Sequence, residues 1–423
     1  MTDVRRLLEV TTDRLEAPGL AEQTLALTRR RARRRVATAA LGAGAVVAAV
    51  VLGVQLEPGV PPPPGQATSP TAAPSTDTGE QPLRAPSIAP SQVQPFWDPA
   101  TVADLPLDET TVLPPVLDPP EGALSLEHAP LQAFAAAVDT GERIGVVDPE
   151  GRWRTLAHPE AAIEPAYVHD TVALSADGAT LVFAGTSTLW WAAAGEGTWR
   201  SVPYPADLDL RAEWDLRLVL VEPSVVQLNG YATRARESRA TTWAVDLVSG
   251  SSRVLPFTLR ETTASRGSTT VALRTDEGLP MLQEWRDGRL TRSMSLGAFD
   301  SLTNPVLGGG VVAASREVSS YGQPREPWEW DGLLVFDVDD GATRGYLPVR
   351  DRNAWYARAG LVPAAWVDAD VLLTRVIPES EGRADSGTAH LVTWDVGSGT
   401  LARVASYDLG SRLVVAPDQL AAG

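Results

Sequence analysis

A short motif that recurs along the second half of the chain limits the folds open to it. Each copy ends an apolar run with an aspartate, places a glycine four residues later, and continues into a second run that contains an arginine. Aspartate and glycine at these positions are typical of tight turns, so each copy predicts two antiparallel strands joined by a hairpin. The copies contain Asp246, Gly250 and Arg253; Asp337, Gly341 and Arg344; and Asp395, Gly399 and Arg403.

The spacing of the hairpins predicts a repeated four-stranded unit. A related hairpin follows Asp148, and the intervals from there to Asp246 and on to Asp337 are each close to two units. Weaker hairpins at 189–204 and 282–296 fill the two gaps. Six hairpins at this spacing predict an all-β fold, a six-bladed β-propeller over residues 123–423.

A second segment agrees with this fold. The sequence LSADGATLVFAG, from Leu174 to Gly185, resembles the L-S-P-D-G-x-x-[LIV]-x-[FY] segment of TolB-type and WD-repeat-like propellers. In those proteins the segment joins the innermost strand of one blade to the next strand. The resemblance implies the propeller architecture, and it leaves the ligand open because one fold serves many functions.

The end of the chain predicts how the ring closes. Residues 413–423, LVVAPDQLAAG, are a degraded copy of the same segment, with Gln419 where glycine is usual. A strand near 412–416 is therefore expected to complete a first blade, which removes an open sheet edge. The other strands of that blade are expected near 131–138, 143–148 and 152–157, and the alternative closing segment is 123–128.

The N-terminal part predicts a single membrane helix. Six arginines between positions 29 and 35 are followed by the uncharged residues 36–56, VATAALGAGAVVAAVVLGVQL. About 20 apolar residues suffice to cross a bilayer, and flanking arginines favour the cytoplasmic side. We therefore expect a basic, partly helical cytoplasmic segment at 1–35, a transmembrane helix at 36–56, and an extracytoplasmic remainder in the cell membrane.

The residues after the predicted helix have the composition of a tether. Residues 57–122 contain 17 of the 34 prolines, with alanine, serine and threonine between them. Such a stretch buries too little apolar surface to fold alone, so it predicts a disordered linker that holds the propeller away from the membrane.

Charge and cysteine content exclude several classes of function. The chain has a net charge of −17 although its first 35 residues are basic, so the predicted ectodomain is strongly acidic and is not expected to bind nucleic acid. The absence of cysteine excludes disulfides and thiolate zinc sites.

The cytoplasmic segment carries a second resemblance. LLEVTTDRL and RRRARRR before the helix, in a chain whose basic residues are all arginine, are similar to actinobacterial single-pass membrane proteins that include membrane-anchored regulators of sigma factors. The resemblance implies a cytoplasmic partner for residues 1–35. The zinc-binding His-x-x-x-Cys-x-x-Cys of many such regulators is missing.

The candidate catalytic and metal sites are each better explained by turns or loops. His158, Glu160, Glu164, His169 and Asp170 could supply metal ligands, but they lie in a proline-containing connection between blades, and we expect no metal or cofactor. Two short matches to aspartic proteases, at Asp139 and Asp385, fall in predicted turns. The sequence therefore contains no catalytic constellation, and we expect no enzyme.

Tryptophan is the residue type that most suggests recognition. The chain has 13 tryptophans against six phenylalanines, and most fall within the repeated hairpins, where they are expected to pack between blades. Four outside the pattern, Trp328, Trp330, Trp355 and Trp366, form a candidate recognition surface for a protein or cell-wall partner, with packing as the alternative. The sequence thus predicts a membrane-anchored binding or scaffold propeller, with a sensor or regulator role through residues 1–35. The alternative is a carboxylate-dependent hydrolase of cell-wall glycan or peptide.

Overall fold

The computed structural model describes most of residues 88–421, which all belong to the compact unit Gly79–Gly423. The described ranges are 88–159, 171–209, 217–232, 240–259, 263–276, 279–296, 302–316, 331–349, 361–377 and 387–421. Within these ranges no helix is long and apolar enough to span a bilayer. The predicted cytoplasmic segment 1–35 and membrane helix 36–56 lie outside the described residues.

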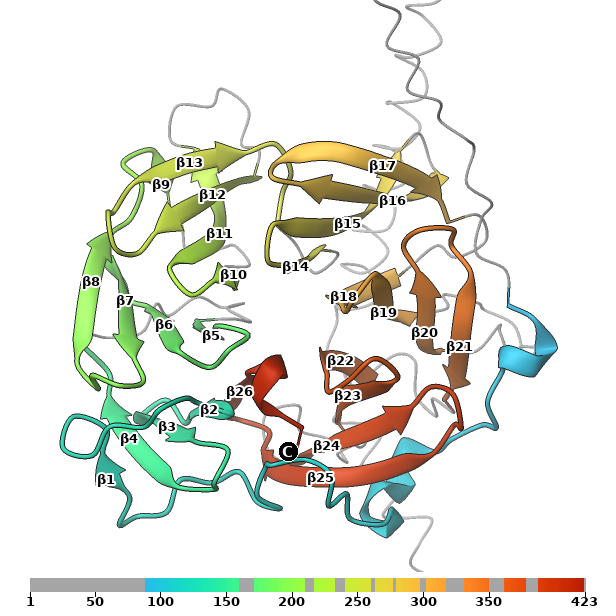
Figure 1. The fold of residues 1–423 in the computed structure, drawn as a ribbon, viewed down its shortest axis with the longest axis horizontal. Helices are drawn as coiled ribbons and strands as arrows, with labels where there is room; N and C mark the ends of the chain where they lie inside the picture. The colour runs from blue at the N-terminus through green and yellow to red at the C-terminus, as the bar shows by residue number, and fades with distance from the viewer. Residues whose placement is uncertain are drawn as a thin grey trace, which may run out of the picture. The chain divides into compact units, whose positions relative to one another are not determined.

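The described strands form six sheets, antiparallel except for the pairing of β1 with β4, and the sheets are arranged as the blades of a ring (Figure 1). The prediction of an all-β six-bladed propeller is confirmed. Blade 1 contains β1 (Leu124–Ser125), β2 (Ala136–Asp139), β3 (Arg143–Val147), β4 (Trp153–Ala157) and β26 (Arg412–Val415). Blade 2 contains β5 (Val172–Leu174), β6 (Thr180–Ala184), β7 (Thr188–Ala193) and β8 (Trp199–Pro203). Blade 3 contains β9 (Leu208–Asp209), β10 (Leu218–Glu222), β11 (Val225–Ala232), β12 (Ala240–Asp246) and β13 (Ser252–Leu255).

The remaining three blades have four strands each. Blade 4 contains β14 (Thr263–Arg266), β15 (Thr269–Asp276), β16 (Leu279–Arg286) and β17 (Arg289–Ser295). Blade 5 contains β18 (Leu302–Leu307), β19 (Val311–Arg316), β20 (Gly332–Asp337) and β21 (Thr343–Pro348). Blade 6 contains β22 (Leu361–Trp366), β23 (Val371–Val376), β24 (Thr388–Asp395) and β25 (Leu401–Asp408). Three short 3-10 helices are also described, at Pro90–Gln92, Pro99–Asp104 and Pro417–Gln419.

The ring is closed by the last strand, as the sequence predicts. β26 pairs antiparallel with β2, from Ala136 opposite Val415 to Asp139 opposite Arg412. The alternative closing segment contributes at the other edge of the same sheet, where β1 pairs in parallel with β4. Blade 1 is therefore built from both ends of the propeller, which locks the ring.

The three turns share one geometry, which explains the repeated motif. In each copy the glycine has a positive φ, 71° at Gly250, 72° at Gly341 and 76° at Gly399. The glycine N–H donates to the main-chain oxygen of the aspartate four residues earlier, at 2.8 to 3.0 Å. Glycine adopts this left-handed conformation without steric cost, so the motif specifies the turn between the third and fourth strands of a blade.

The segment before the first blade differs from the prediction. Composition assigns residues 88–122 to the linker, but the structure packs them on the outside of the ring, where Figure 1 shows them beside β21 and β25. We call residues 88–131 the N-terminal strap. Its apolar side chains explain the difference, because Trp97, Val102, Leu113 and Leu117 are all buried against the blades.

Candidate functional site: the groove between blades 3 and 4

Five of the six interfaces between neighbouring blades are filled by large apolar side chains. Trp366 and Trp394 pack between blades 5 and 6, Phe134 and Phe183 between blades 1 and 2, and Trp243 and Leu228 between blades 2 and 3. Among the described residues between blades 3 and 4, the buried apolar cluster consists of Ala244, Leu255 and Phe257, with the partly buried Val225 and Trp285 packed against it. This interface is therefore under-filled relative to the other five.

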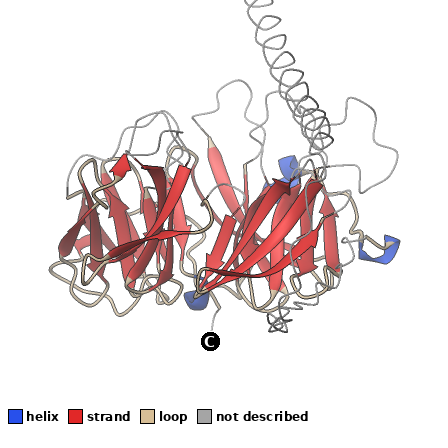
Figure 2. Ribbon diagram, turned by 90° about the horizontal axis from the view of Figure 1, so that it is seen from above, coloured by secondary structure: helices blue, strands red, loops and turns tan. Residues whose placement is uncertain are grey.

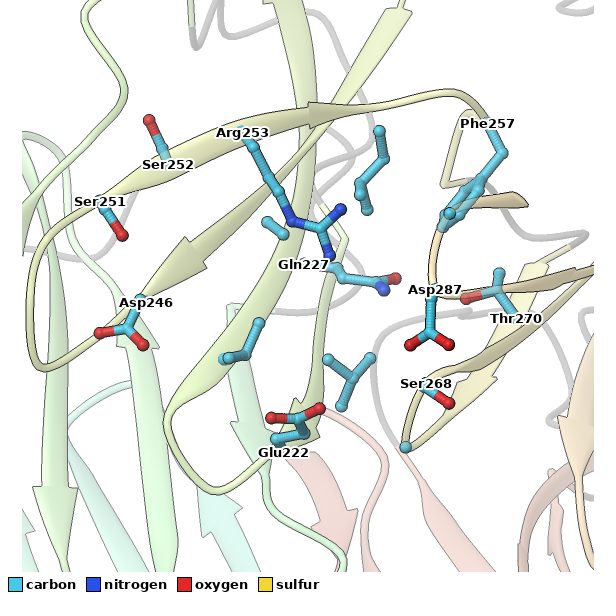
Figure 3. A pocket seen from close by; sticks show the side chains of 16 residues that line it. Glu222, Gln227, Asp246, Ser251, Ser252, Arg253, Phe257, Ser268, Thr270 and Asp287 are labelled. Atoms are coloured by element: carbon cyan, nitrogen blue, oxygen red, sulfur yellow. The ribbon is translucent and has the colours of Figure 1, made fainter.

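The small and polar side chains at this interface leave a groove. Gln227 and Ala244 of blade 3 and Thr270 of blade 4 line it with small or polar side chains. The groove has a volume of about 340 Å³ and is lined by residues of both blades (Figure 3). A space of this size is large enough for a side chain or a short stretch of peptide.

Arg253 of β13 is the cation of the groove. Figure 3 shows its guanidinium pointing into the space toward Gln227. Arg253 is exposed, and its guanidinium makes no hydrogen bond or ion pair with the described residues. A guanidinium free in an open groove has five donors available for a carboxylate or another planar anion.

The equivalent arginine in blade 5 behaves differently. Arg344 donates from Nε to Asp337 Oδ1 at 2.9 Å, and its Nη2 lies 2.7 Å from the same oxygen. These contacts to Asp337 raise the pKa of Arg344. In blade 3 the corresponding Asp246 instead accepts the N–H groups of Val248 and Ser249 at 3.0 and 2.7 Å. Arg253 is thus free because its own aspartate is occupied by the turn.

The turn hydrogen bonds also affect the charge of Asp246. The hydrogen bonds from Ser249 and then that from Val248 lower the pKa of Asp246, since they favour the ionised carboxylate. Asp246 is partly exposed, so this lowered pKa reflects the turn and supplies no base for the groove.

Two carboxylates stand at the rim of the groove. Glu222, at the end of β10, and Asp287, in the turn between β16 and β17, are both exposed and have no side-chain hydrogen bond in the described structure. Asp287 has a φ of 49°, which aspartate tolerates better than most residues. The rim is therefore negative and the centre positive, an arrangement that selects against multiply charged anions.

The floor of the groove is a satisfied polar network. Ser265 Oγ donates to Gln227 Oε1 at 3.0 Å and lies 2.8 Å from Thr270 Oγ1. Leu255 and Phe257 supply an apolar wall, against which Trp285 of blade 4 packs. The groove thus combines one free cation, an apolar wall and polar groups already in hydrogen bonds.

A second polar cluster lies between blades 1 and 2 and is structural. His158 Nε2 is 3.0 Å from Asp139 Oδ1, the Gly141 N–H donates to the same oxygen at 2.8 Å, and Arg412 Nη1 lies 3.5 Å from Oδ2. Burial alone would raise the pKa of Asp139, but these hydrogen bonds and positive charges outweigh it and lower the pKa. His158 also stacks on Phe183, at 5.0 Å between ring centroids.

This cluster accounts for two of the residues that the sequence offered for chemistry. Asp139 and His158 pair with each other, whereas Glu160, Glu164, His169, Asp170 and Asp385 lie outside the described residues. No group of three or more metal-ligating side chains occurs in the part of the chain that the structure describes.

The predicted tryptophan surface is described at one position only. Trp366 is 5% exposed, packs in the core between blades 5 and 6, and donates from its indole N–H to Val306 O at 3.3 Å. It is therefore not available as an exposed platform, because the inter-blade interface encloses its ring. Trp328, Trp330 and Trp355 lie outside the described residues.

The groove itself was missed by the sequence analysis. Part of its signal is present in the repeat, since the position two residues before the motif aspartate is Ala244 in blade 3, Val335 in blade 5 and Thr393 in blade 6. Only the register of the strands shows that Ala244 stands opposite Arg253 and faces the neighbouring blade.

The comparisons with known proteins found distant structural matches alone. No family model and no curated protein matches the sequence. Among solved structures, TolB from Acinetobacter baumannii is 11% identical with a TM-score of 0.44, and the match covers 67% of this chain and 66% of TolB, just under two thirds of it. A putative TolB from Agrobacterium tumefaciens is 10% identical with a TM-score of 0.40, over 69% of this chain and all of that one. BamB from Moraxella catarrhalis is 14% identical with a TM-score of 0.31, over 66% and 74% of the two chains.

Proposed function

We propose that this chain is a membrane-anchored extracytoplasmic binding or scaffold module that recognises its partner at the groove between blades 3 and 4. The observation that carries the proposal is the free guanidinium of Arg253 at the interface with the smallest apolar cluster among the described residues. An arginine that is unpaired beside an apolar wall is typical of a site that is completed by a ligand. The remaining interfaces are already filled by the chain's own side chains.

The sequence supports the membrane anchor in this proposal. The arginines at 29–35 and the uncharged residues 36–56 favour a helix with its N-terminus in the cytoplasm. The proline-rich residues that follow allow the propeller to reach a protein or cell-wall partner outside the membrane. Residues 1–35 then offer a site for a cytoplasmic partner, so the protein acts as a sensor or regulator.

The lowered pKa values of two described carboxyl groups favour binding over hydrolysis at these two positions. A general acid in glycoside or peptide hydrolysis needs a raised pKa. The pKa values of Asp139 and Asp246 are instead both lowered, because each carboxylate accepts hydrogen bonds within its own turn or cluster. Neither group is suited to donate a proton at neutral pH.

Photo-crosslinking from the groove tests the site. A photoreactive amino acid would replace Ser252 in the full chain in its native membrane, with a second probe at Thr343, the equivalent position of blade 5. We expect the probe at 252 to form an intermolecular adduct that Arg253→Gln abolishes and Arg344→Gln does not. The probe at 343 should instead crosslink to the strap, because Gln92 donates to the Thr343 carbonyl. An adduct at 252 that is insensitive to Arg253→Gln, or no adduct, would refute the proposed site.

A deletion tests the signalling part separately. Affinity purification after crosslinking would compare the full chain with a variant that lacks residues 2–28 but keeps the arginines that precede the helix. A cytoplasmic partner that is recovered only with the full chain would support a regulator. Identical extracytoplasmic partners for both forms would reduce residues 1–35 to an anchor and leave the groove as the functional site.

A further inference from the structure

The N-terminal strap shows that the outer edges of these blades accept an added strand. The strap forms parallel bridges to the outermost strands of blades 5 and 6, with Val93 opposite Tyr346, Trp97 opposite Val349, and Leu107 opposite Arg403. Its last part, β1, pairs in parallel with the outermost strand of blade 1. Each of these additions to an outer edge is parallel to the strand that it joins.

The strap also fills the interfaces that it passes. Its apolar side chains enter four successive inter-blade cores: Ile88 and Val93 between blades 4 and 5, Trp97 and Val102 between blades 5 and 6, Leu113 and Leu117 between blades 6 and 1, and Leu126 and Leu131 between blades 1 and 2. A segment added at an outer edge therefore pairs its main chain with the edge and buries an apolar side chain beside it.

In the other two copies of the motif, the strap pairs with the outermost strand at the arginine or near it. In blade 6 the strap pairs directly at Arg403, whose N–H donates to Pro106 O and whose carbonyl accepts from Asp108, each at 2.8 Å. In blade 5 the strap pairs two residues beyond Arg344. In blade 3 no described segment pairs with the outer edge of β13, although β13 carries the third arginine of the series.

Exposed apolar side chains mark the same region. Outside the strap, the large apolar residues that are exposed in the described structure are Val248 at 75%, Val254 at 62% and Leu290 at 48%. All three belong to blades 3 and 4. Leu290 pairs across its sheet with Trp285, which packs on the apolar wall of the groove. Apolar surface beside an open strand edge is typical of an interaction site.

From these observations we propose the class of ligand: an extended peptide segment of a protein partner that adds in parallel to the outer edge of β13, with an acidic residue followed two positions later by an apolar residue. The proposal rests on the proposed binding function of the groove. Arg253 and Leu255 are two residues apart on β13, so both side chains lie on the face that lines the groove. A parallel partner strand would place its acid beside Arg253 and its apolar side chain beside Leu255 and Phe257.

The charges at the rim sharpen this assignment. Glu222 and Asp287 repel a dianionic phosphate more strongly than a single carboxylate. They also favour a basic residue elsewhere in the segment, which would lie nearer to the rim. The partner segment is therefore expected to contain a lone acid and no net negative charge.

Fluorescence polarisation with the full chain in nanodiscs tests the ligand class. The probe is the labelled peptide Ser-Glu-Thr-Leu-Thr-Arg, with Ser-Gln-Thr-Leu-Thr-Arg and the order-reversed Ser-Leu-Thr-Glu-Thr-Arg as matched controls. We expect the first peptide to bind at least about tenfold more tightly than either control, because a hydrogen-bonded charge pair and the order of the two side chains are both needed. Arg253→Gln should remove this preference and Arg344→Gln should keep it, and inorganic phosphate should not compete.

Other results would refute the proposed ligand class, and they would show separately whether the proposed binding site at Arg253 also fails. Equal binding of the first and the reversed peptide would show that the carboxylate alone is recognised, without strand pairing. No peptide binding, together with an adduct at position 252 that depends on Arg253, would leave a binding site for a different ligand. An intramolecular adduct from position 252 to residues 57–87 would show that the chain's own linker occupies the edge. Loss of both peptide binding and the adduct's dependence on Arg253 would refute the proposed function as well.

Discussion

Removing the indole of Trp97 should measure how firmly the N-terminal strap belongs to the propeller. Trp97 is 8% exposed and packs in the core between blades 5 and 6, and its main-chain N–H donates to Pro348 O at 3.1 Å. A tryptophan buries about 150–250 Å², which is worth about 4–6 kcal/mol at about 25 cal/mol per Å². If the strap stays docked only through such contacts, Trp97→Ala should weaken the fold more than any other single change in the strap.

Two corrections bring this value down. Residual compactness of the unfolded chain removes about a third of the buried area. The indole nitrogen is buried without a hydrogen-bond partner in the described structure, which already costs the native state about 1 kcal/mol. We therefore expect Trp97→Ala to lower the free energy of unfolding by about 2–3 kcal/mol, or the Tm by about 4 °C for about 300 ordered residues.

Differential scanning calorimetry of the full chain in detergent would measure the change. The control is Leu107→Ala, a strap residue that is 45% exposed and should change stability by no more than about 0.5 kcal/mol. Equal and small effects of the two substitutions would refute the reasoning, because they would mean that the strap does not contribute its buried side chains to the folded propeller. The strap would then be no precedent for a segment added at β13.

Three further predictions concern the turns, the pH dependence and the groove. Gly178→Ala should lower the Tm far more than Gly141→Ala. Both glycines have a positive φ, but a Cβ at 178 would lie 2.1 Å from Phe134 O, whereas a Cβ at 141 meets nothing within 4 Å. Similar losses of Tm in calorimetry would show that backbone strain, not the contact with Phe134, governs both sites. His390 is buried, and burial followed by the charge of Arg403 lowers its pKa, so the stability it contributes is present above its unfolded value of about 6.5 and is lost as the pH falls toward its folded pKa. Chemical denaturation between about pH 7.5 and pH 5 should therefore show a slope that His390→Gln reduces, and an unchanged slope would contradict this role. Arg253→Gln should leave the Tm within about 1 °C of the wild type, since the guanidinium has no partner in the described structure; a loss comparable to that of Trp97→Ala would show that Arg253 is structural.

The repeat motif made the architecture predictable from the sequence. The aspartate and glycine of each hairpin are required by the local geometry of one turn, so their spacing can be recognised in the sequence without knowledge of the tertiary structure. Ring closure was predictable for a related reason, because β26 carries a recognisable, degraded copy of the segment that follows the inner strand of blade 2. Both the hairpin turns and the closing strand are specified by short, local stretches of sequence.

The strap and the groove depend on contacts between residues that are distant in the sequence. The composition of residues 88–122 wrongly predicted a linker, and no local pattern predicted the groove. Proline-rich residues 88–122 were assigned to the linker, yet Trp97 and Leu117 are enough to dock them once the blades provide interfaces. The groove exists because Ala244 and Gln227 of one blade face Thr270 of the next, a relation that appears only when the strands are in register. Trp366 shows the converse, since its position outside the hairpin motif did not place it on the surface.

The groove is tied to the end of the described chain through blade 4. In the side view the strands run between the two faces of the ring, and loops and turns lie at both faces (Figure 2). Arg266 of blade 4 pairs with Asp418 of the C-terminal 3-10 helix at 2.9 Å, which ties the end of the chain to the blade that forms one wall of the groove. The site is thus supported by the closed ring rather than by a separate loop.

Hydrogen–deuterium exchange of the full chain in nanodiscs, with and without the Ser-Glu-Thr-Leu-Thr-Arg peptide, tests the central claim most directly. The account predicts that the ligand slows amide exchange in Ser252–Leu255 and in the turns of blade 4 that line the groove, while Thr343–Pro348, already covered by the strap, stays unchanged. Protection confined to another interface or to the inner strands of the ring would contradict it, because the partner would then bind a surface other than the groove at Arg253.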